Sequence, residues 1–233
     1  MILAFDTATE ATTVALCDFD RVELELRDDP PAGVRPRHTA KLMQFVVEVM
    51  DKASVGWEAI EKIAVGVGPG TFTGLRIGLA SARGLALARG LPLAGVSTLR
   101  SLALGAALRE PAQEDLAILA AIDARRGEAF AAGWLGGREL LAPQAFAPEE
   151  LAAAAAELAE PTMAVGTGAV KFRAVLERAG ALIPETASEL HRVSALTHCR
   201  LARDLPAQHP DKVHPEYLRL PDAEIARHSS GSR

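Results

Sequence analysis

The chain has 233 residues, a formal net charge of −5, 49% apolar residues and only 4% aromatic residues. Its length fits one or two compact lobes, and its apolar content is enough for a substantial core. The acidic balance and the absence of any Lys/Arg-rich run argue against a protein that binds nucleic acid mainly by itself.

The first thirty residues predict three short strands: Ile2–Asp6, Thr12–Cys17 and Val22–Leu26. The first two are apolar or β-branched, and the third alternates with the period of a half-exposed strand. Their short links favour an antiparallel meander. After a Pro/Gly/Arg loop, apolar residues at helical spacing predict an amphipathic helix over His38–Ser54.

Strands and helices then alternate to the end of the chain. Thr71–Arg89 predicts a helix ended by Gly90, and Ala124–Gly127 is typical of a hairpin turn. The other predicted strands are Ile63–Val67, Leu91–Val96, Leu116–Asp123, Glu128–Leu135 and Thr162–Val165, and the other helices are Ser97–Leu108, Pro148–Ala159, Ala169–Arg178 and Val193–Leu205.

This order is expected of a mixed α/β lobe used twice. We expect a first lobe over residues 1–103, a smaller second lobe over 104–213 and an extended tail over 214–233. The polar end His228–Arg233 is expected to be disordered. The last helix could pack on either lobe.

A carboxylate at the end of the first strand begins the sequence Asp6-Thr7-Ala8-Thr9. Kinase-like ATPases place an acid at such a hairpin, where glycine lets a phosphate approach the backbone. Here Ala8 stands where glycine would help, so the set has two readings. One is a vestigial nucleotide site that includes Asp6, Thr7, Thr9, Gly166 and Gly168. The other is a turn in which the Asp and Thr side chains hydrogen-bond their own backbone.

The block from Val65 to Gly78 is rich in glycine but lacks the Gly-Lys-Ser/Thr of a phosphate-binding loop. In the helix that follows, Gly74, Gly78, Ala82 and Ala86 form one small-residue stripe, and Ala80, Gly84 and Ala88 form a second. Each glycine inside a helix lowers stability by about 0.5–1 kcal/mol relative to alanine. We therefore expect these glycines to allow close approach of the helix backbone to the sheet or to a second helix. One stripe can serve the chain's own sheet, and a second favours an intermolecular interface.

The helix over His38–Ser54 carries apolar residues over more than half its circumference. A surface helix needs only one apolar stripe to pack on its own lobe. Met43, Val47 and Met50 are additional to that stripe, so we expect a partner to cover them. Burial inside a larger lobe is the alternative.

Neither a metal site nor a set of catalytic residues can be assembled from the local patterns. Cys17 and Cys199 have no metal spacing, and no pair of histidines follows HxxxH. We place His38 at a solvated helix start. No GxSxG sequence is present. The start of the chain lacks a basic signal region and no apolar run approaches about 20 residues, so we expect a cytoplasmic protein without a membrane segment.

Several segments, in order, resemble the TsaB (YeaZ) family: Ile2–Ala8, Val65–Ala80, Gly95–Leu99, Ile122–Phe130 and His214–Arg219. The Gly-Pro-Gly-Thr-Phe-Thr-Gly-Leu-Arg-Ile-Gly block is the most specific of them. The resemblance implies an α/β fold of the actin-like ATPase (ASKHA) class, with two ribonuclease-H-like lobes whose mixed sheets are flanked by helices.

For function, the resemblance implies a non-catalytic subunit needed to form threonylcarbamoyladenosine in tRNAs that read codons beginning with A. The implied partners are a catalytic TsaD-like subunit, a TsaE-like ATPase and tRNA through the complex, with a homodimer when the chain is alone. TsaD carries a metal-binding HxxxH. In this sequence His38 stands in the place of the first histidine, but Leu42 stands where the second histidine would be.

The resemblance also implies where partners bind. The dimer face would consist of Leu42, Met43, Val46, Val47, Met50, Gly74, Leu75, Gly78, Leu79, Ala82, Arg83 and Ala86. No cofactor is expected in the isolated subunit, whereas ATP or ADP with Mg²⁺ belongs at subunit interfaces of the complex. The alternatives are an ATP-dependent enzyme of the same fold with Asp123 assisting a metal, a peptidase, and a purely structural homodimer.

Overall fold

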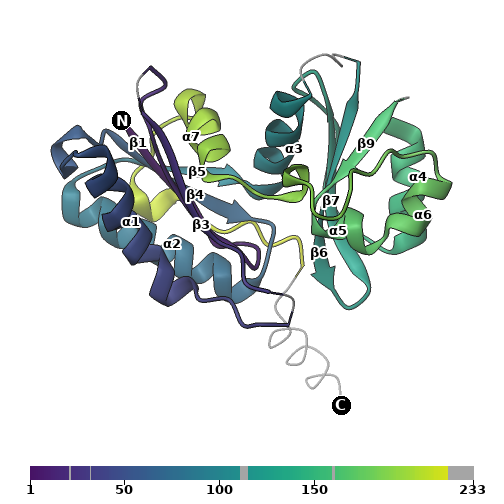
Figure 1. The fold of residues 1–233 in the computed structure, drawn as a ribbon, viewed down its shortest axis with the longest axis horizontal. Helices are drawn as coiled ribbons and strands as arrows, with labels where there is room; N and C mark the ends of the chain where they lie inside the picture. The colour runs from purple at the N-terminus through teal and green to yellow at the C-terminus, as the bar shows by residue number, and fades with distance from the viewer. Residues whose placement is uncertain (21, 32, 111–114, 159–160, 220–233) are drawn as a thin grey trace.

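The computed structural model describes residues 1–20, 22–31, 33–110, 115–158 and 161–219. Within these ranges the chain forms two β-sheets in neighbouring lobes, each sheet covered by helices on both faces (Figure 1). The end His228–Arg233, which was expected to be disordered, lies outside the described residues.

The first sheet has the strand order β3-β2-β1-β4-β5. An antiparallel meander of β1, β2 and β3 is extended by β4 and β5, which run parallel to β1. β1 and β2 are buried along their whole length, because helices cover both faces of the sheet. The strands are β1 (Ile2–Asp6), β2 (Thr12–Cys17), β3 (Glu23–Asp28), β4 (Lys62–Gly68) and β5 (Leu93–Ser97).

Helices α1 (His38–Ala53) and α2 (Phe72–Arg89) cover one face of this sheet, with the short 3₁₀ helix η1 (Trp57–Ala59) after α1. Gly90 adopts a left-handed conformation, with φ 65°, and ends α2 as its sequence predicted. The last long helix, α7 (Ala195–Asp204), packs on the opposite face, against β1 and β2.

The second sheet has the order β8-β7-β6-β9 and repeats this arrangement without a counterpart of β5. Its strands are β6 (Ala117–Arg125), β7 (Glu128–Leu135), β8 (Arg138–Phe146) and β9 (Thr162–Val165). Helix α3 (Thr98–Arg109) and the 3₁₀ helix η2 (Glu189–His191) cover one face; α4 (Pro148–Leu158), α5 (Thr167–Lys171) and α6 (Arg173–Arg178) cover the other. An antiparallel meander extended by a parallel strand therefore occurs twice, as the expected two-lobed α/β class requires.

Two elements differ from the sequence prediction. Strand β8 lies in a stretch for which the sequence predicts no strand. It is an edge strand that pairs only with β7, and its burial pattern is irregular. The predicted helix Ala169–Arg178 is two short helices that meet at Phe172. The expected lobe boundary at residue 103 also falls inside α3, whose apolar side chains join the core of the second sheet.

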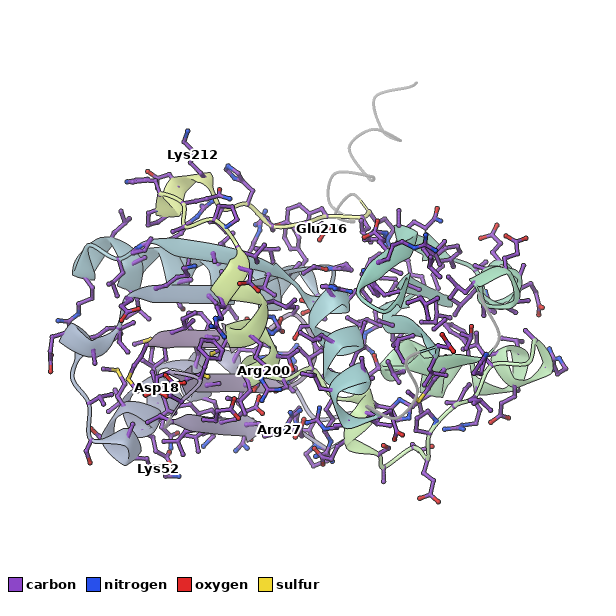
Figure 2. All side chains as sticks on the ribbon, turned by 90° about the horizontal axis from the view of Figure 1, so that it is seen from above. Asp18, Arg27, Lys52, Arg200, Lys212 and Glu216 are labelled. Carbon is purple, nitrogen blue, oxygen red and sulfur yellow. The ribbon has the colours of Figure 1, made fainter. Side chains whose placement is uncertain are left out.

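Residues 205–219 cross from the first lobe to the second (Figure 1). Gln208 exchanges two backbone hydrogen bonds with Leu93 of β5, and the 3₁₀ helix η3 (Pro210–Lys212) follows. The N–H of Glu216 then donates to the carbonyl of Val67 at 2.7 Å. Figure 2 shows Lys212 and Glu216 along this path. Arg219 ends it on the β6–β7 hairpin, donating to Glu128 at 2.6 Å and to the carbonyl of Ala124 at 2.8 Å.

Candidate functional site

The outward side of α1 and α2 carries exposed apolar and small residues. Met43 is 41% exposed, and Val47 and Leu87 are each 56% exposed. The two helices contact one another on the same face of the first sheet, so these side chains belong to one surface. We call it the α1–α2 face and define it by Ala40, Met43, Val47, Ala80, Gly84, Leu87 and Ala88.

Most residues expected at the dimer face point instead into their own lobe. Of the surplus residues on α1, Met50 is only 6% exposed and joins the core. The sequence does not reveal which side of each helix faces the sheet, because α1 is apolar around most of its circumference. The expected residues that the chain itself buries are Leu42, Val46, Met50, Gly74, Leu75, Gly78, Leu79, Ala82 and Ala86.

The first small-residue stripe of α2 is explained by the chain's own packing. A β-carbon at Gly74 would overlap the carbonyl oxygen of Thr7, and one at Gly78 would lie 2.5 Å from the Thr7 hydroxyl. That hydroxyl donates to the carbonyl of Gly74 at 2.7 Å. The stripe therefore lets α2 approach the end of β1, and no second chain is needed to account for it.

The second stripe has no such explanation. Ala80, Gly84 and Ala88 are exposed, and a β-carbon at Gly84 would have no atom within 4 Å. A glycine in the middle of a helix lowers stability by about 0.5–1 kcal/mol relative to alanine. Gly84 therefore leaves a smooth strip on the α1–α2 face at a cost that packing inside the chain does not offset.

Arg83 lies at the border of the α1–α2 face, half-buried. Its Nη2 atom donates to the carbonyl of Val213 at 2.5 Å, which ties α2 to the tail. Its buried Nε atom has no hydrogen-bond partner, unlike every other buried side-chain nitrogen or oxygen of the described residues.

The expected nucleotide residues lie at the junction of the lobes, but Asp6 faces inward and is fully buried. Its Oδ2 atom accepts hydrogen bonds from Thr98 Oγ1 at 2.9 Å and from His198 Nε2 at 3.0 Å, and its Oδ1 atom accepts from the N–H of Ala8 at 2.7 Å. Burial alone would raise the pKa of Asp6. The bonds and charge from His198, with those from Ala8 and Thr98, lower this pKa below its ordinary value.

His198 also contacts Ser101, whose Oγ atom lies 2.8 Å from His198 Nδ1. The fold thus assembles Ser101, His198 and Asp6 in one chain of contacts, a set that the sequence reasoning missed because the residues come from α3, α7 and β1. All three have 0% exposure, so a substrate carbonyl has no path to the serine. This network is a buried polar core that joins three elements.

The residues at this junction do not fit a nucleotide with its metal ion. The carboxylate of Asp6 is occupied by three donors, and Gly66 packs so closely that a β-carbon there would overlap it. A β-carbon at Gly166 would overlap the carbonyl of Ala121, and Gly168 packs against the same residue. These glycines therefore serve the packing of α5 on β6.

The cavities between the lobes are small. Thr9 lines two of them, of about 70 and 130 Å³, whereas small-molecule sites usually occupy roughly 300–1,000 Å³. Arg125 of the second lobe pairs with Glu10 of the first at 2.5 Å beside them. Asp123, the candidate metal assistant, pairs with Lys171 at 2.7 Å.

His38 is not solvated, contrary to the sequence expectation. It is 5% exposed, and its Nδ1 atom lies 2.9 Å from the hydroxyl of Thr12. Burial lowers the pKa of His38 below its ordinary value of 6.5. The loop before α1 brings the helix start down onto β2, which local periodicity does not reveal.

Among the described residues, no three His, Cys, Asp or Glu side chains converge as metal ligands. In the same part of the chain, no helix is both long and apolar enough to cross a membrane. Cys17 and Cys199 are free and buried, and burial raises the pKa of each thiol.

Comparison with known proteins gives a consistent result. Residues 29–226 match the protein family described as "TsaD: tRNA N6-adenosine threonylcarbamoyltransferase". The solved structure of YeaZ from Pseudomonas aeruginosa is 30% identical, with a TM-score of 0.70, over 92% of this chain and 99% of that one. A second structure from that organism, described as an uncharacterized protein with similarity to peptidase YEAZ, has a TM-score of 0.71 at 30% identity and covers 94% and 99% of the two chains.

The Escherichia coli tRNA threonylcarbamoyladenosine biosynthesis protein TsaB is 40% identical over 129 residues, which are 55% of this chain and 52% of that protein. The protein of the same name from Haemophilus influenzae is 31% identical over 129 residues, or 51% of its length. The matched region thus spans about half the length of these curated relatives.

Proposed function

The chain belongs to the TsaB (YeaZ) family, and from this membership we propose that it is a non-catalytic subunit in the formation of threonylcarbamoyladenosine in tRNA. In this role it binds a catalytic TsaD-like subunit through the α1–α2 face and keeps that subunit in its active arrangement. The assembled pair then recruits a TsaE-like ATPase and tRNA.

The observation that carries the proposal is the α1–α2 face, where Gly84 and Leu87 of α2 and Val47 of α1 are exposed. Small residues on one helix allow the backbone of a partner helix to come close, and large apolar residues beside them exclude water on association. Two adjacent helices with this surface fit a four-helix contact with the equivalent helices of a relative. The same face supports a homodimer when the catalytic subunit is absent.

The net charge of the chain supports a complex in which another subunit contacts the tRNA phosphates. The chain has a net charge of −5, whereas proteins that bind tRNA phosphates depend on clustered Lys and Arg. The catalytic subunit therefore supplies most phosphate contacts. The inward-facing Asp6 and the small cavities between the lobes support a chain that provides an interface rather than a nucleotide site of its own. ATP or ADP with Mg²⁺ then binds where subunits meet.

The test is size-exclusion chromatography with light scattering, on the chain alone and mixed with the TsaD-like protein of the same source. We expect a one-to-one complex that Val47→Glu abolishes. Leu182→Glu is the matched control, because Leu182 is 55% exposed in the other lobe. Circular dichroism of both variants checks folding. Absence of a complex with the unaltered chain, or equal loss in both variants, would contradict the docking role.

The ATP-dependent alternative is tested separately. Isothermal titration of the isolated chain with Mg-ATP should give no saturable heat at micromolar concentrations. Micromolar binding would favour an enzyme with its own nucleotide site.

A further inference from the structure

The second lobe contains a cavity of about 330 Å³ that the docking role does not use. It lies between α3 and the strands β6 and β7, and the turn at Gly136–Gly137 also lines it. Its size falls within the range of roughly 300–1,000 Å³ typical of small-molecule sites. It exceeds both cavities between the lobes.

The walls of this cavity are mostly apolar. Trp134 and Ile118 come from the sheet, and Ala103, Leu104 and Ala107 come from successive turns of α3. Leu104 is half-buried and Ala107 is exposed, so the cavity opens to solvent along the helix. A site of this kind recognises the apolar body of a ligand by burying its surface.

The positively charged side chain of Arg100 lines this largely apolar cavity. The guanidinium of Arg100 lies 5.4 Å from the centre of the Trp134 ring, and its Nη2 atom donates to the carbonyl of Gly137 at 3.0 Å. Arg100 makes no ion pair with any residue that the structure describes. Burial lowers the pKa of Arg100, and the negative charge of Glu139 offsets this decrease only in part. A half-buried arginine with several unused donors is suited to bind an anionic group.

The charge at the other end limits what the ligand can be. Glu110 also lines the cavity and follows α3 ten residues after Arg100, about 15 Å along the helix axis. A second negative group near that end would be repelled. The site therefore suits a ligand with one anionic group and an uncharged body.

We propose that this cavity binds a small amphiphilic monoanion, with its carboxylate or equivalent group on Arg100 and its apolar body against Trp134, Leu104 and Ile118. The site is in the opposite lobe from the α1–α2 face and does not depend on the proposed docking role. Its ligand class is a short acyl or aryl carboxylate.

The test uses the fluorescence of Trp134, in a Trp57→Phe background because the chain has two tryptophans. Octanoate is the probe, with 1-octanol and octyltrimethylammonium as its uncharged and cationic counterparts. We expect octanoate to change the emission saturably, 1-octanol to bind more weakly, and the cation not to bind. Arg100→Gln should weaken octanoate at least tenfold, and 1-octanol less than twofold.

Two further variants complete the design. Arg109→Gln, on the same helix but outside the cavity, should leave octanoate binding unchanged. Ala107→Phe should block octanoate and 1-octanol alike by filling the entrance from its exposed side, with the melting temperature retained. No saturable change at millimolar octanoate, or equal weakening of octanoate by Arg100→Gln and Arg109→Gln, would overturn the proposal.

Discussion

The imidazole of His198 lies 3.0 Å from the carboxylate of Asp6, and neither residue is exposed to solvent. They are 192 positions apart in the chain. Their contact holds α7 against β1, and Thr98 adds the start of α3 to the same carboxylate. In this fold an acid at the end of β1 therefore joins a helix from the middle of the sequence to one from its last fifth.

Asp6→Ala should lower the free energy of unfolding by about 3–5 kcal/mol, because it leaves the buried partners of the carboxylate without an acceptor. Urea unfolding followed by circular dichroism measures this change. Asp123→Ala removes a partly exposed ion pair with Lys171 and should cost less than about 1 kcal/mol. Similar losses in the two variants would mean that the buried network does not stabilise the fold.

Ser101→Ala should leave tRNA modification by the reconstituted complex within about twofold of the unaltered rate. Ser101 touches His198 but is fully buried, so it cannot act as a nucleophile in the folded chain. The measurement is the rate of threonylcarbamoyladenosine formation with all subunits present. A large loss of rate with normal folding and normal complex formation would revive the peptidase hypothesis.

Alanine substitutions at two glycines of α2 should have opposite effects on the isolated chain. Gly84→Ala should raise stability by about 0.5–1 kcal/mol, because nothing occupies the space around its β-carbon. Gly78→Ala should lower stability by about 1–3 kcal/mol, since its β-carbon would press on Thr7. Denaturant midpoints test both variants, and a loss of stability in Gly84→Ala would contradict the exposed position of the second stripe.

Acid should weaken the fold through His38. Burial holds the folded pKa of His38 below its ordinary value of 6.5, so the unfolded chain binds more protons as pH falls. The contribution of neutral His38 is complete above pH 6.5 and declines as pH falls toward the folded pKa, by at most about 1.4 kcal/mol per pH unit.

Urea midpoints at pH 7.5 and pH 5.5 test this expectation in the unaltered chain and in His38→Gln. The unaltered chain should lose more stability between the two values than the variant does. Burial also lowers the pKa of His191, but His191 is present in both chains. The difference between the two chains therefore reports His38. An equal loss in both chains would show that His38 is not the titrating group.

Arg219→Ala should loosen the contact between the tail and the second lobe. Both hydrogen bonds of Arg219 to the β6–β7 hairpin are lost, but the site is partly exposed, so we expect a stability change of about 1 kcal/mol or less. Hydrogen exchange at Glu216 and in the hairpin should become faster. Lys52→Ala, which removes an ion pair within α1, should leave those amides unchanged.

Much of this arrangement follows from local sequence patterns. Ile2–Asp6, Thr12–Cys17 and Thr162–Val165 were predicted at their observed bounds, because apolar and β-branched runs between turn residues specify strands. The end of α2 at Gly90 follows from the freedom of glycine to adopt a positive φ. The motif order was also sufficient to identify the family, which the comparisons then confirmed.

The tertiary structure decided what each element faces. Periodicity showed that α1 and α2 are apolar but not that Met50 and Leu79 point inward while Val47 and Leu87 stay exposed. It placed Asp6 at a strand end without revealing that His198 covers it, since that contact spans almost the whole chain. Local patterns specify an element by its period of 2 or 3.6 residues, whereas the packing of distant elements determines which side chains remain available to a partner.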